Sequence, residues 1–300
     1  MDIRINGEKA DIIIETEKTV GDILACLDTW LSGDGARGKE NLRLSGLYID
    51  GKKVDARSLE DSFGRELAAV ESLDITVSSL HELVYTALCD TLEALKEWRG
   101  LDFQGRQVCA ESWRTSPAAA LLGEQYPELC AMAAQTLAGE APGERILAAV
   151  IDERMRELED PVSELAGMEQ LTGDVSERLE NLPLDIQTGK DKRASETVQL
   201  FTGVAEKIFR IFNILKARGV PLGGITVASP NSSGDNASAD TAEIPVADFL
   251  NEFNASLTEM LAAYEQKDSV LVGDLAEYEM APRLRAFYAA IKNPAEKAAV

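Results

Sequence analysis

The spacing of apolar residues changes once along the chain, near residue 79. Before that point, apolar and polar side chains alternate in short runs, which is typical of β-strands with one buried face. From Leu80 onward, apolar residues recur every three or four positions, which predicts amphipathic helices. The sequence therefore predicts an α+β protein with an N-terminal β domain, residues 1–79, followed by an all-α helical bundle, residues 80–300.

Turn and cap residues set the boundaries expected for the elements of the first part. Asn6-Gly7 predicts a β-hairpin, because this dipeptide favours the tight turn that joins two antiparallel strands. Thr19 with Asp22 predicts the capped start of a helix. The strands expected around that helix are residues 1–6, 11–15, 42–49, 52–54 and 73–77, with a helical turn at 58–61.

Cap residues also mark the starts of helices in the second part. Ser79 with Glu82 forms a capping-box pattern, so a helix is expected to follow the last strand almost without a linker. Ser116-Pro117 and Asp160-Pro161 each place a capping side chain before a proline at the first helical position. They predict an alanine-rich helix to about residue 123 and another helix that continues to residue 182.

Two long apolar stripes predict the centre of the bundle. One runs from Ala194 to Leu215 and the other from Val246 to Tyr264, in alternating steps of four and three residues, and such stripes pack helix on helix. Phe201 lies in the first stripe and is expected in the bundle core. Residues 229–240 lack bulky apolar side chains, so a flexible loop is expected at about 228–243.

Three segments of the first part share the pattern of a known fold. Leu42–Leu44, Ile49–Asp55 and Ser58–Asp61 are similar to the third strand, the following turn and the short helical turn of ubiquitin. The similarity covers about a quarter of the chain. Residues 1–79 thus resemble the ubiquitin-like β-grasp superfamily, and the resemblance implies a mixed sheet wrapped on one helix.

The same resemblance bears on partner binding. Aligned on the turns, Tyr48, Asp74 and Thr76 occupy the positions of the exposed apolar patch through which ubiquitin binds partners. Only Tyr48 keeps an apolar body, so Tyr48 is retained as a candidate partner-binding residue and the patch as a whole is not reproduced. The chain continues past Ser79 instead of ending in Gly-Gly, so conjugation as a modifier is not expected.

The chain is strongly acidic, with 30 Lys and Arg residues, 52 Asp and Glu residues and a formal net charge of −22. This charge repels phosphate backbones and anionic membrane surfaces, so nucleic-acid binding is not expected. No apolar run approaches the ~20 residues that a membrane-spanning helix needs, and no secretory signal pattern follows Met1. These features predict a cytoplasmic protein without membrane insertion.

Candidate catalytic residues are sparse. Cys109 stands near Arg106 and Arg114 and is the cysteine with the best prospect of a stabilised thiolate. An ordinary buried thiol is the expected interpretation, because the four cysteines show no paired spacing. His81 is the single histidine and is expected at the surface or at the domain junction. No catalytic residue is therefore predicted.

The best group of carboxylates lies near the C-terminal end, at Asp268, Asp274, Glu277 and Glu279. Asp274 and Glu277 are three residues apart, so on a helix they share a face and are candidate ligands for a hard cation. Such clusters are expected by chance among 52 acids, and no Glu-x-x-His pattern accompanies this one. No metal and no cofactor are therefore predicted.

One segment is basic in this acidic chain. Residues 182–193 combine apolar side chains with Lys190, Lys192 and Arg193, between two predicted helices. One interpretation is a loop whose cations complement the end of the preceding helix. The other is a binding site for an acidic partner or a phosphate group, and these three residues are its candidate members.

Taken together, these features predict a non-enzymatic protein–protein interaction module that works as an adaptor, scaffold or chaperone-like protein with a protein partner. The absence of a catalytic pattern and the long apolar stripes favour this interpretation. One alternative is a helical-bundle enzyme that uses buried carboxylates on a phosphorylated substrate. Another is a structural subunit of a larger assembly, for which the oligomeric state is the discriminating measurement.

Overall fold

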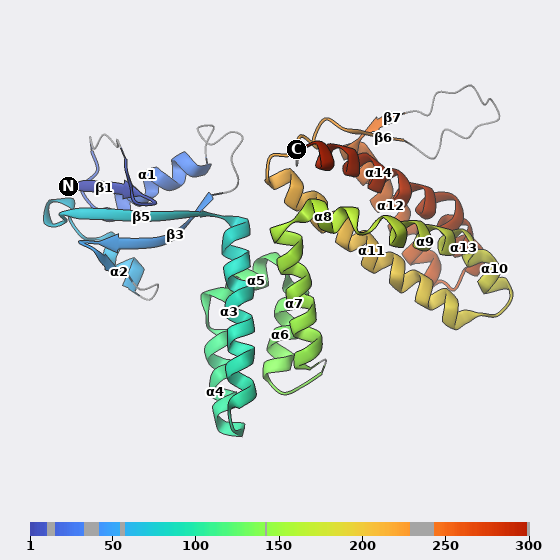
Figure 1. The fold of residues 1–300 in the computed structure, drawn as a ribbon, viewed down its shortest axis with the longest axis horizontal. Helices are drawn as coiled ribbons and strands as arrows, with labels where there is room; N and C mark the ends of the chain where they lie inside the picture. The colour runs from blue at the N-terminus through green and yellow to red at the C-terminus, as the bar shows by residue number, and fades with distance from the viewer. Residues whose placement is uncertain (11–15, 33–41, 55–57, 142, 229–242, 299–300) are drawn as a thin grey trace. The chain divides into compact units, whose positions relative to one another are not determined.

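The computed structural model describes residues 1–10, 16–32, 42–54, 58–141, 143–228 and 243–298 (Figure 1). An N-terminal five-stranded sheet is followed by a mostly helical region, so the predicted α+β class is confirmed. Internal contacts divide the chain into two compact units, Met1–Leu158 and Glu159–Val300. This division differs from the predicted boundary at residue 79, because the first helices after the sheet belong to the first unit.

The sheet of the first unit has the strand order β2-β1-β5-β3-β4. β1 and β5 pair in parallel, whereas the other neighbouring strands are antiparallel. The strands are β1 (Asp2–Ile5), β2 (Glu8–Lys9), β3 (Leu42–Ile49), β4 (Lys52–Lys53) and β5 (Ser72–Ser79). The strands predicted at 42–49 and 73–77 are thus confirmed, and the one predicted at 11–15 lies outside the described residues.

The core of the sheet forms against helix α1 (Val20–Ser32) (Figure 1). Two short helices, α2 (Leu59–Phe63) and η3 (Leu67–Ala69), precede β5 in the chain. Val20 and Ile23 of α1 are buried in one cluster with Leu73 and Ile75 of β5. The hairpin predicted at Asn6-Gly7 is present, and both residues have positive φ, 53° and 79°. A two-residue turn with this backbone matches the twist of antiparallel strands.

The predicted helix caps are confirmed by their hydrogen bonds. Thr19 Oγ1 accepts from the Asp22 backbone N–H at 3.2 Å, and Asp22 Oδ2 accepts from the Thr19 N–H at 2.8 Å. Ser79 and Glu82 make the same reciprocal pair at 3.2 and 2.8 Å. Ser79 is both the last residue of β5 and the cap of the next helix, so strand and helix join without a linker.

The helices of the first unit are α3 (Leu80–Gly100), α4 (Phe103–Arg114), α5 (Pro117–Gln125), α6 (Pro127–Leu137) and α7 (Glu144–Glu159). A buried hydrogen bond ties two of them together, since Trp113 of α4 donates from Nε1 to Oγ1 of Thr91 on α3 at 3.1 Å. Ser116 caps α5 by accepting from the backbone N–H of Ala119 at 3.2 Å, as its position before a proline predicted. The first bond fixes α4 against α3, and the second fixes the start of α5.

The second unit contains α8 (Pro161–Ala166), α9 (Glu169–Glu180), α10 (Leu182–Gln187), α11 (Asp191–Ala217), α12 (Val246–Glu265), α13 (Ser269–Asp274), the π-helical segment η5 (Leu275–Met280) and α14 (Ala281–Ala298). Asp160 caps α8 as predicted, with its Oδ1 accepting from Ser163 N–H at 3.0 Å. The prediction of a single helix from there to residue 182 is wrong, because the helix is interrupted between the end of α8 at Ala166 and the start of α9 at Glu169. The break lets Leu165 of α8 and Val175 of α9 enter the same core.

Two short strands flank part of the predicted loop at 228–243. β6 (Thr226–Ala228) pairs antiparallel with β7 (Glu243–Pro245), so residues 228 and 243 belong to a small sheet. Each strand has three residues, which is too short for alternation to be recognised in sequence. The remainder of the predicted loop, residues 229–242, lies outside the described residues.

The two apolar stripes meet in the core of the second unit, as predicted. Phe201 and Phe253 are each 1% exposed, and their ring centroids lie 6.5 Å apart. Phe209 approaches Phe253 at 5.5 Å, and Phe249 stacks on Phe287 at 5.7 Å. This aromatic cluster joins α11, α12 and α14.

A buried arginine lies beside this core. The side chain of Arg283, in α14, is 2% exposed and forms ion pairs with Glu279 of η5 and with Glu252 of α12, the latter at 3.6 Å. Burial lowers the pKa of Arg283, and Glu252 opposes that change. The charge is therefore compensated inside the fold, where an unpaired cation is strongly destabilising.

Candidate functional site

An apolar groove opens on the second unit, and we call it the α10–α13 groove. Its volume is about 450 Å³. Apolar lining comes from Leu182 and Ile186 of α10, Ala194 and Val198 of α11, and Val272 of α13. Leu182 and Val272 are buried, so the floor is part of the core and is held by its packing. A preformed concave surface of this kind binds apolar groups at a small ordering cost.

The rim of the groove is polar, with exposed apolar side chains close to it. Tyr264, at the end of α12, lines the groove and is 61% exposed, although the stripe pattern placed it with the core residues. Leu184 of α10 and Val270 of α13 are 55% and 71% exposed on the helices that form the walls. An exposed amphipathic side chain that lines a groove, such as Tyr264, is typical of an interaction surface.

A glycine sets the distance between two walls of the groove. A Cβ atom built on Gly273, in α13, would lie 3.1 to 3.2 Å from three atoms of Pro183, in α10, including its Cα. Such distances are too short for an ordinary contact, and Pro183 has a rigid ring. The two helices therefore approach closely only because residue 273 has no side chain.

We expect Gly273→Ala to destabilise the second unit by about 1–3 kcal/mol, because α10 and α13 must separate to admit the methyl group. Gly203→Ala is the matched control, since Gly203 lies in α11 and a Cβ there meets nothing within 4 Å. The control variant should gain up to about 1 kcal/mol from helix propensity. Urea unfolding measures the stability of both variants. Equal stability would show that the close approach of α10 and α13 contributes nothing to the free energy of unfolding.

The predicted basic segment is placed at one end of this groove. It is not one loop, because α10 spans residues 182–187 and α11 begins at Asp191. Lys190 Nζ lies 3.2 Å from Asp185 Oδ1, and Arg193 Nε lies 3.0 Å from Asp185 Oδ2. The Asp185 side chain is only 4% exposed. Two of the three predicted cations thus hold a buried carboxylate of α10, which differs from the expected interaction with the helix end.

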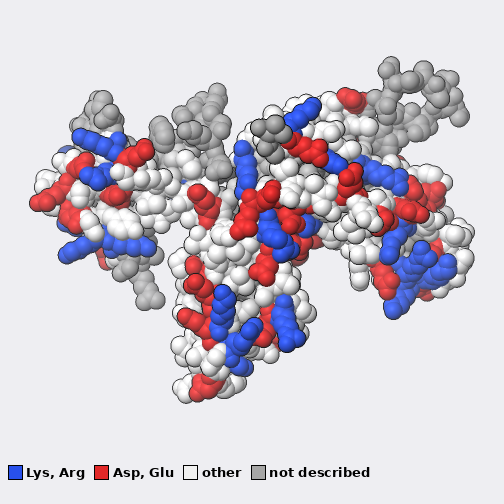
Figure 2. Space-filling view, viewed as in Figure 1, with Lys and Arg blue, Asp and Glu red and all other residues white. Residues whose placement is uncertain are grey.

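The cations nevertheless remain at the surface. Figure 2 shows a cluster of Lys and Arg side chains over the end of the unit where α10 and α11 meet. The side chains of Lys190 and Arg193 are about half exposed, and that of Lys192 is 93% exposed with Glu196 at 3.7 Å. Lys267, exposed between α12 and α13, adds a cation to the lining of the groove. The structure therefore brings the basic segment and an apolar groove together.

Tyr48, the other predicted site residue, lies in β3 of the first unit. It pairs with Lys53 on one side and with Asp74 on the other, and Thr76 pairs with Gly46 one step along. Tyr48, Asp74 and Thr76 are all partly exposed, whereas the alternate residues of β5 are buried. The three residues thus share one face of the sheet, which is polar except for Tyr48.

The thiol environments do not favour a reactive cysteine. Burial raises the pKa of Cys109, and the nearby Glu97 raises it further. The two arginines expected to stabilise its thiolate bond elsewhere, since Arg106 donates to the Leu101 carbonyl at 3.0 Å and Arg114 pairs with Glu111 at 3.2 Å. Cys109 donates from Sγ to the Ala94 carbonyl at 3.5 Å. It is a packed thiol.

The C-terminal acids do not form a common site. Asp268 accepts from the Leu271 backbone N–H at 3.1 Å and caps α13, and Glu279 pairs with Arg283. Glu277 lies in the π-helical segment after Asp274, so the two do not keep the α-helical spacing on which the cation proposal rested. Among the residues that the structure describes, no three metal-binding side chains converge.

Two protein-family models match parts of the chain. Residues 1–79 match the family described as the TP0873 N-terminal domain, and residues 164–290 match a family described as a domain of unknown function (DUF8042). All residues named above for the α10–α13 groove fall within the second match. The first match coincides with the predicted N-terminal domain.

The chain is also similar to an uncharacterized protein of Treponema pallidum (strain Nichols). The two are 32% identical over 104 residues, which cover 32% of this chain and 48% of that protein. The chain thus matches that relative over about half of the relative's length. No solved structure matches. In the described part of the chain, a helix with the length and hydrophobicity to cross a bilayer is not found.

Sequence reasoning missed most of the groove. Lys190, Lys192 and Arg193 stand together in sequence and were recognised, but Tyr264 and Val272 come from segments about 70 to 80 residues away. Asp185 was not recognised as the buried partner of two cations. The available signal was its position five residues before Lys190 on a short helix with apolar neighbours. A one-dimensional pattern does not show which acid faces inward.

Proposed function

We propose that the protein is a cytoplasmic, non-enzymatic protein–protein interaction module, which acts as an adaptor, scaffold or chaperone-like partner. Its docking site is the α10–α13 groove, and the segment that docks there is an acidic peptide with an apolar anchor. The observation that carries the proposal is an apolar groove whose charged lining residues are Lys267 and Asp191, in a chain of net charge −22. Lys190, Lys192 and Arg193 lie at the start of α11, the helix that forms one wall.

The groove supplies the short-range part of binding. An apolar side chain of the partner that enters it leaves water and contacts Ile186, Ala194 and Val198, and anchors of this kind carry most of the energy of an interface. Tyr264 at the rim adds a large amphipathic surface of the type enriched at interfaces. The anchor therefore fixes the register of the docked segment.

The cations supply the long-range part. Most of the chain repels an acidic partner, so association is favoured where the local charge is positive. Lys192 and Lys267 suit this role because both side chains reach solvent and neither is paired with the buried Asp185. The four cysteines are free thiols, which agrees with the reducing compartment included in the proposal.

The enzyme alternative receives less support from the buried carboxylates. Asp185 is held by two cations, and the fully buried Glu157 accepts from Arg154 at 3.0 Å. Each acid lies in a packed ion pair, which fits a structural role. Neither acid lines the α10–α13 groove.

Reversing Lys192 and Lys267 to Glu should weaken binding of an acidic peptide about tenfold at low salt, mainly through a slower association rate, and less at high salt. A peptide-display selection on the full-length protein supplies the probe, and its binders should combine Asp or Glu with a bulky apolar residue. Kinetics of a selected peptide at two salt concentrations then test the variant. Lys190 and Arg193 are left unchanged because they pair with Asp185. Without them, a buried carboxylate would have no cation beside it, and the fold would be destabilised.

The control is the double variant Lys9→Glu with Lys52→Glu, which changes the net charge equally at exposed residues of β2 and β4. It should keep the wild-type affinity. If both double variants lose the same affinity for the peptide, the effect is due to the net charge of the protein and not to the groove. Acid-containing peptides that bind the wild type and the Lys192→Glu, Lys267→Glu variant equally would remove the groove's cations from the site.

A further inference from the structure

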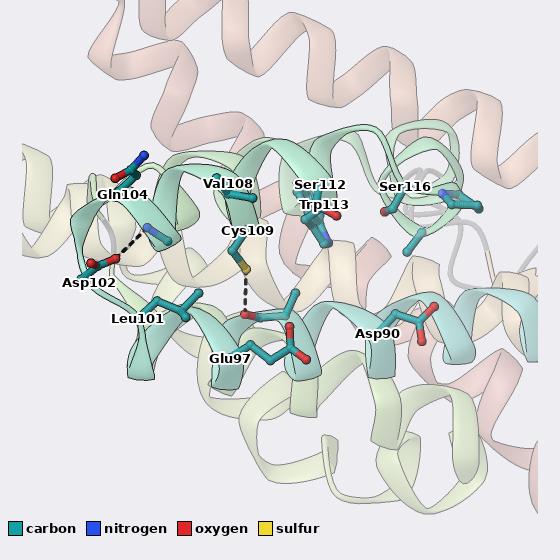
Figure 3. A pocket seen from close by; sticks show the side chains of 14 residues that line it. Asp90, Glu97, Leu101, Asp102, Gln104, Val108, Cys109, Ser112, Trp113 and Ser116 are labelled. Atoms are coloured by element: carbon teal, nitrogen blue, oxygen red, sulfur yellow. Dashed lines mark hydrogen bonds between the residues drawn. The ribbon is translucent and has the colours of Figure 1, made fainter.

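A second groove lies on the first unit, between α3 and α4, and we call it the α3–α4 groove (Figure 3). Its volume is about 770 Å³. Figure 3 shows Asp90 and Glu97 along α3, with Val108, Cys109 and Ser112 on α4 across from them. The start of α5 closes one end at Ser116. The groove is thus a channel between two helices.

The floor of this groove is apolar and fixed by hydrogen bonds. Trp113 is 5% exposed, and its indole N–H is bound to Thr91. The Cys109 thiol is bound to the Ala94 carbonyl of the facing helix. Leu101 and Val108 line the groove and are 39% and 66% exposed, so apolar surface is presented to solvent on a rigid support.

The charged side chains that line the groove all have one sign. They are the carboxylates of Asp90, Glu97 and Asp102. Burial raises the pKa of Asp90, and the neighbouring Glu93 raises it further, as occurs where a carboxylate lacks a compensating cation. The site is therefore electrostatically suited to a basic ligand.

The nearest arginines on α4 do not supply that compensation. Arg106 lies with its guanidinium carbon 4.3 Å from the centroid of the Trp98 ring and donates to backbone carbonyls at the end of α3. Arg114 pairs with Glu111. Neither arginine lines the groove. Among the described side chains that line the groove, none is cationic.

The length of the groove indicates the form of its ligand. The acidic positions on α3 and the following turn extend from Asp90 to Asp102, which at 1.5 Å per residue corresponds to about 18 Å, or about three helical turns. An amphipathic helix of that length presents apolar residues at i, i+3, i+4 and i+7 to such a channel.

We propose that the α3–α4 groove binds a basic amphipathic helix of a partner protein. Its apolar stripe packs on Leu101, Val108 and the Trp113 floor, and its Lys or Arg side chains face Asp90, Glu97 and Asp102. Residues 90–118 lie between the two family matches, at 1–79 and 164–290, so this site is separate from the α10–α13 groove. The protein then holds two partners of opposite charge.

The test uses the full-length protein and a synthetic helix of about 16 residues, in which Leu occupies i, i+3, i+4 and i+7 and Lys and Ala fill the other positions. Its acidic counterpart carries Glu in place of Lys. At the α3–α4 groove, the basic helix should bind with a Kd below about 1 mM and at least about tenfold more tightly than the acidic one. Methyl NMR signals of Ala94, Leu101 and Val108 should shift on binding.

Two variants separate the apolar and the electrostatic contributions. Val108→Ser should weaken binding of the basic helix about five- to tenfold, because a buried apolar contact is lost. Asp90→Asn with Glu97→Gln should weaken it about fivefold at low salt, with a smaller effect at high salt. Both changes are at the surface, and circular dichroism verifies that each variant is folded.

Matched controls are placed on the second unit or away from the groove. Leu171→Ser changes a 44% exposed leucine of α9, and Glu140→Gln with Glu259→Gln removes two exposed carboxylates. Both controls should bind the basic helix as the wild type does. No binding, equal shifts of the Ala94, Leu101 and Val108 methyl signals with the acidic helix, or an equal loss in the control variants would overturn the proposal. Each result leaves the α10–α13 groove untouched, so the two proposals fail separately.

Discussion

Replacing Phe253 with alanine is expected to lower the free energy of unfolding of the second unit by about 3–5 kcal/mol, since the ring is lost and a cavity remains. Phe253 is 1% exposed and has the rings of Phe201, Phe209 and Phe249 at 6.5, 5.5 and 6.0 Å. Aromatic pairs of this geometry add about 0.5–1.5 kcal/mol beyond the buried area. The substitution removes ring contacts both within α12 and between α12 and α11.

Hydrogen exchange on peptides from α11, α12 and α14 measures this loss locally, which matters because a chain with two compact units need not unfold in one step. Phe103→Ala is the control for the same chemical change. Phe103 is 78% exposed, so its variant should stay within about 0.5 kcal/mol of the wild type. A loss below about 1 kcal/mol for Phe253→Ala would contradict the central position of the ring.

Arg283→Leu should destabilise the second unit by about 2–4 kcal/mol. The arginine is 2% exposed, and its removal leaves Glu252 and Glu279 facing a cavity without their cation. The expected cost is below the largest values known for broken buried pairs, because the two glutamates are 42% and 26% exposed and keep some hydration. Thermal or urea unfolding of the variant measures the change.

Arg285→Leu is the matched control on the same helix. Arg285 pairs with Glu180 at the surface, where it is 45% exposed, so its loss should cost no more than about 1 kcal/mol. The double variant Arg283→Leu with Glu279→Leu should be more stable than Arg283→Leu alone, since one uncompensated carboxylate is removed as well. If both arginine variants lose the same stability, burial of Arg283 carries no special weight.

Features set by neighbouring residues were predictable from the sequence. The Thr19–Asp22 and Ser79–Glu82 caps have the predicted partners, because each cap depends on residues three positions apart. The long stripes also led correctly to Phe201 and Phe253 in one core. Their period is a property of the helix itself, so tertiary structure was not needed to see it.

Features that depend on distant segments were not predictable. Tyr264 continues the period of its helix but lies 61% exposed at the rim of a groove, since α12 ends one residue later. The basic segment was recognised by its charge. Two of its cations form ion pairs with Asp185, whose burial results from the packing of α10. The α3–α4 groove was missed altogether, because its acids resembled the general composition of the chain.

The direct join at Ser79 restricts how this protein can change during evolution. Ser79 pairs with Leu42 in the sheet and also caps α3, so the strand and the helix share one residue. One residue inserted there would rotate α3 by about 100° around its axis. That rotation would turn α3, together with the helices packed on it, relative to β3 and β5, the strands that α3 contacts. Insertions and deletions at this junction should therefore be rare in its descendants, and the sheet should be inherited together with its first helix.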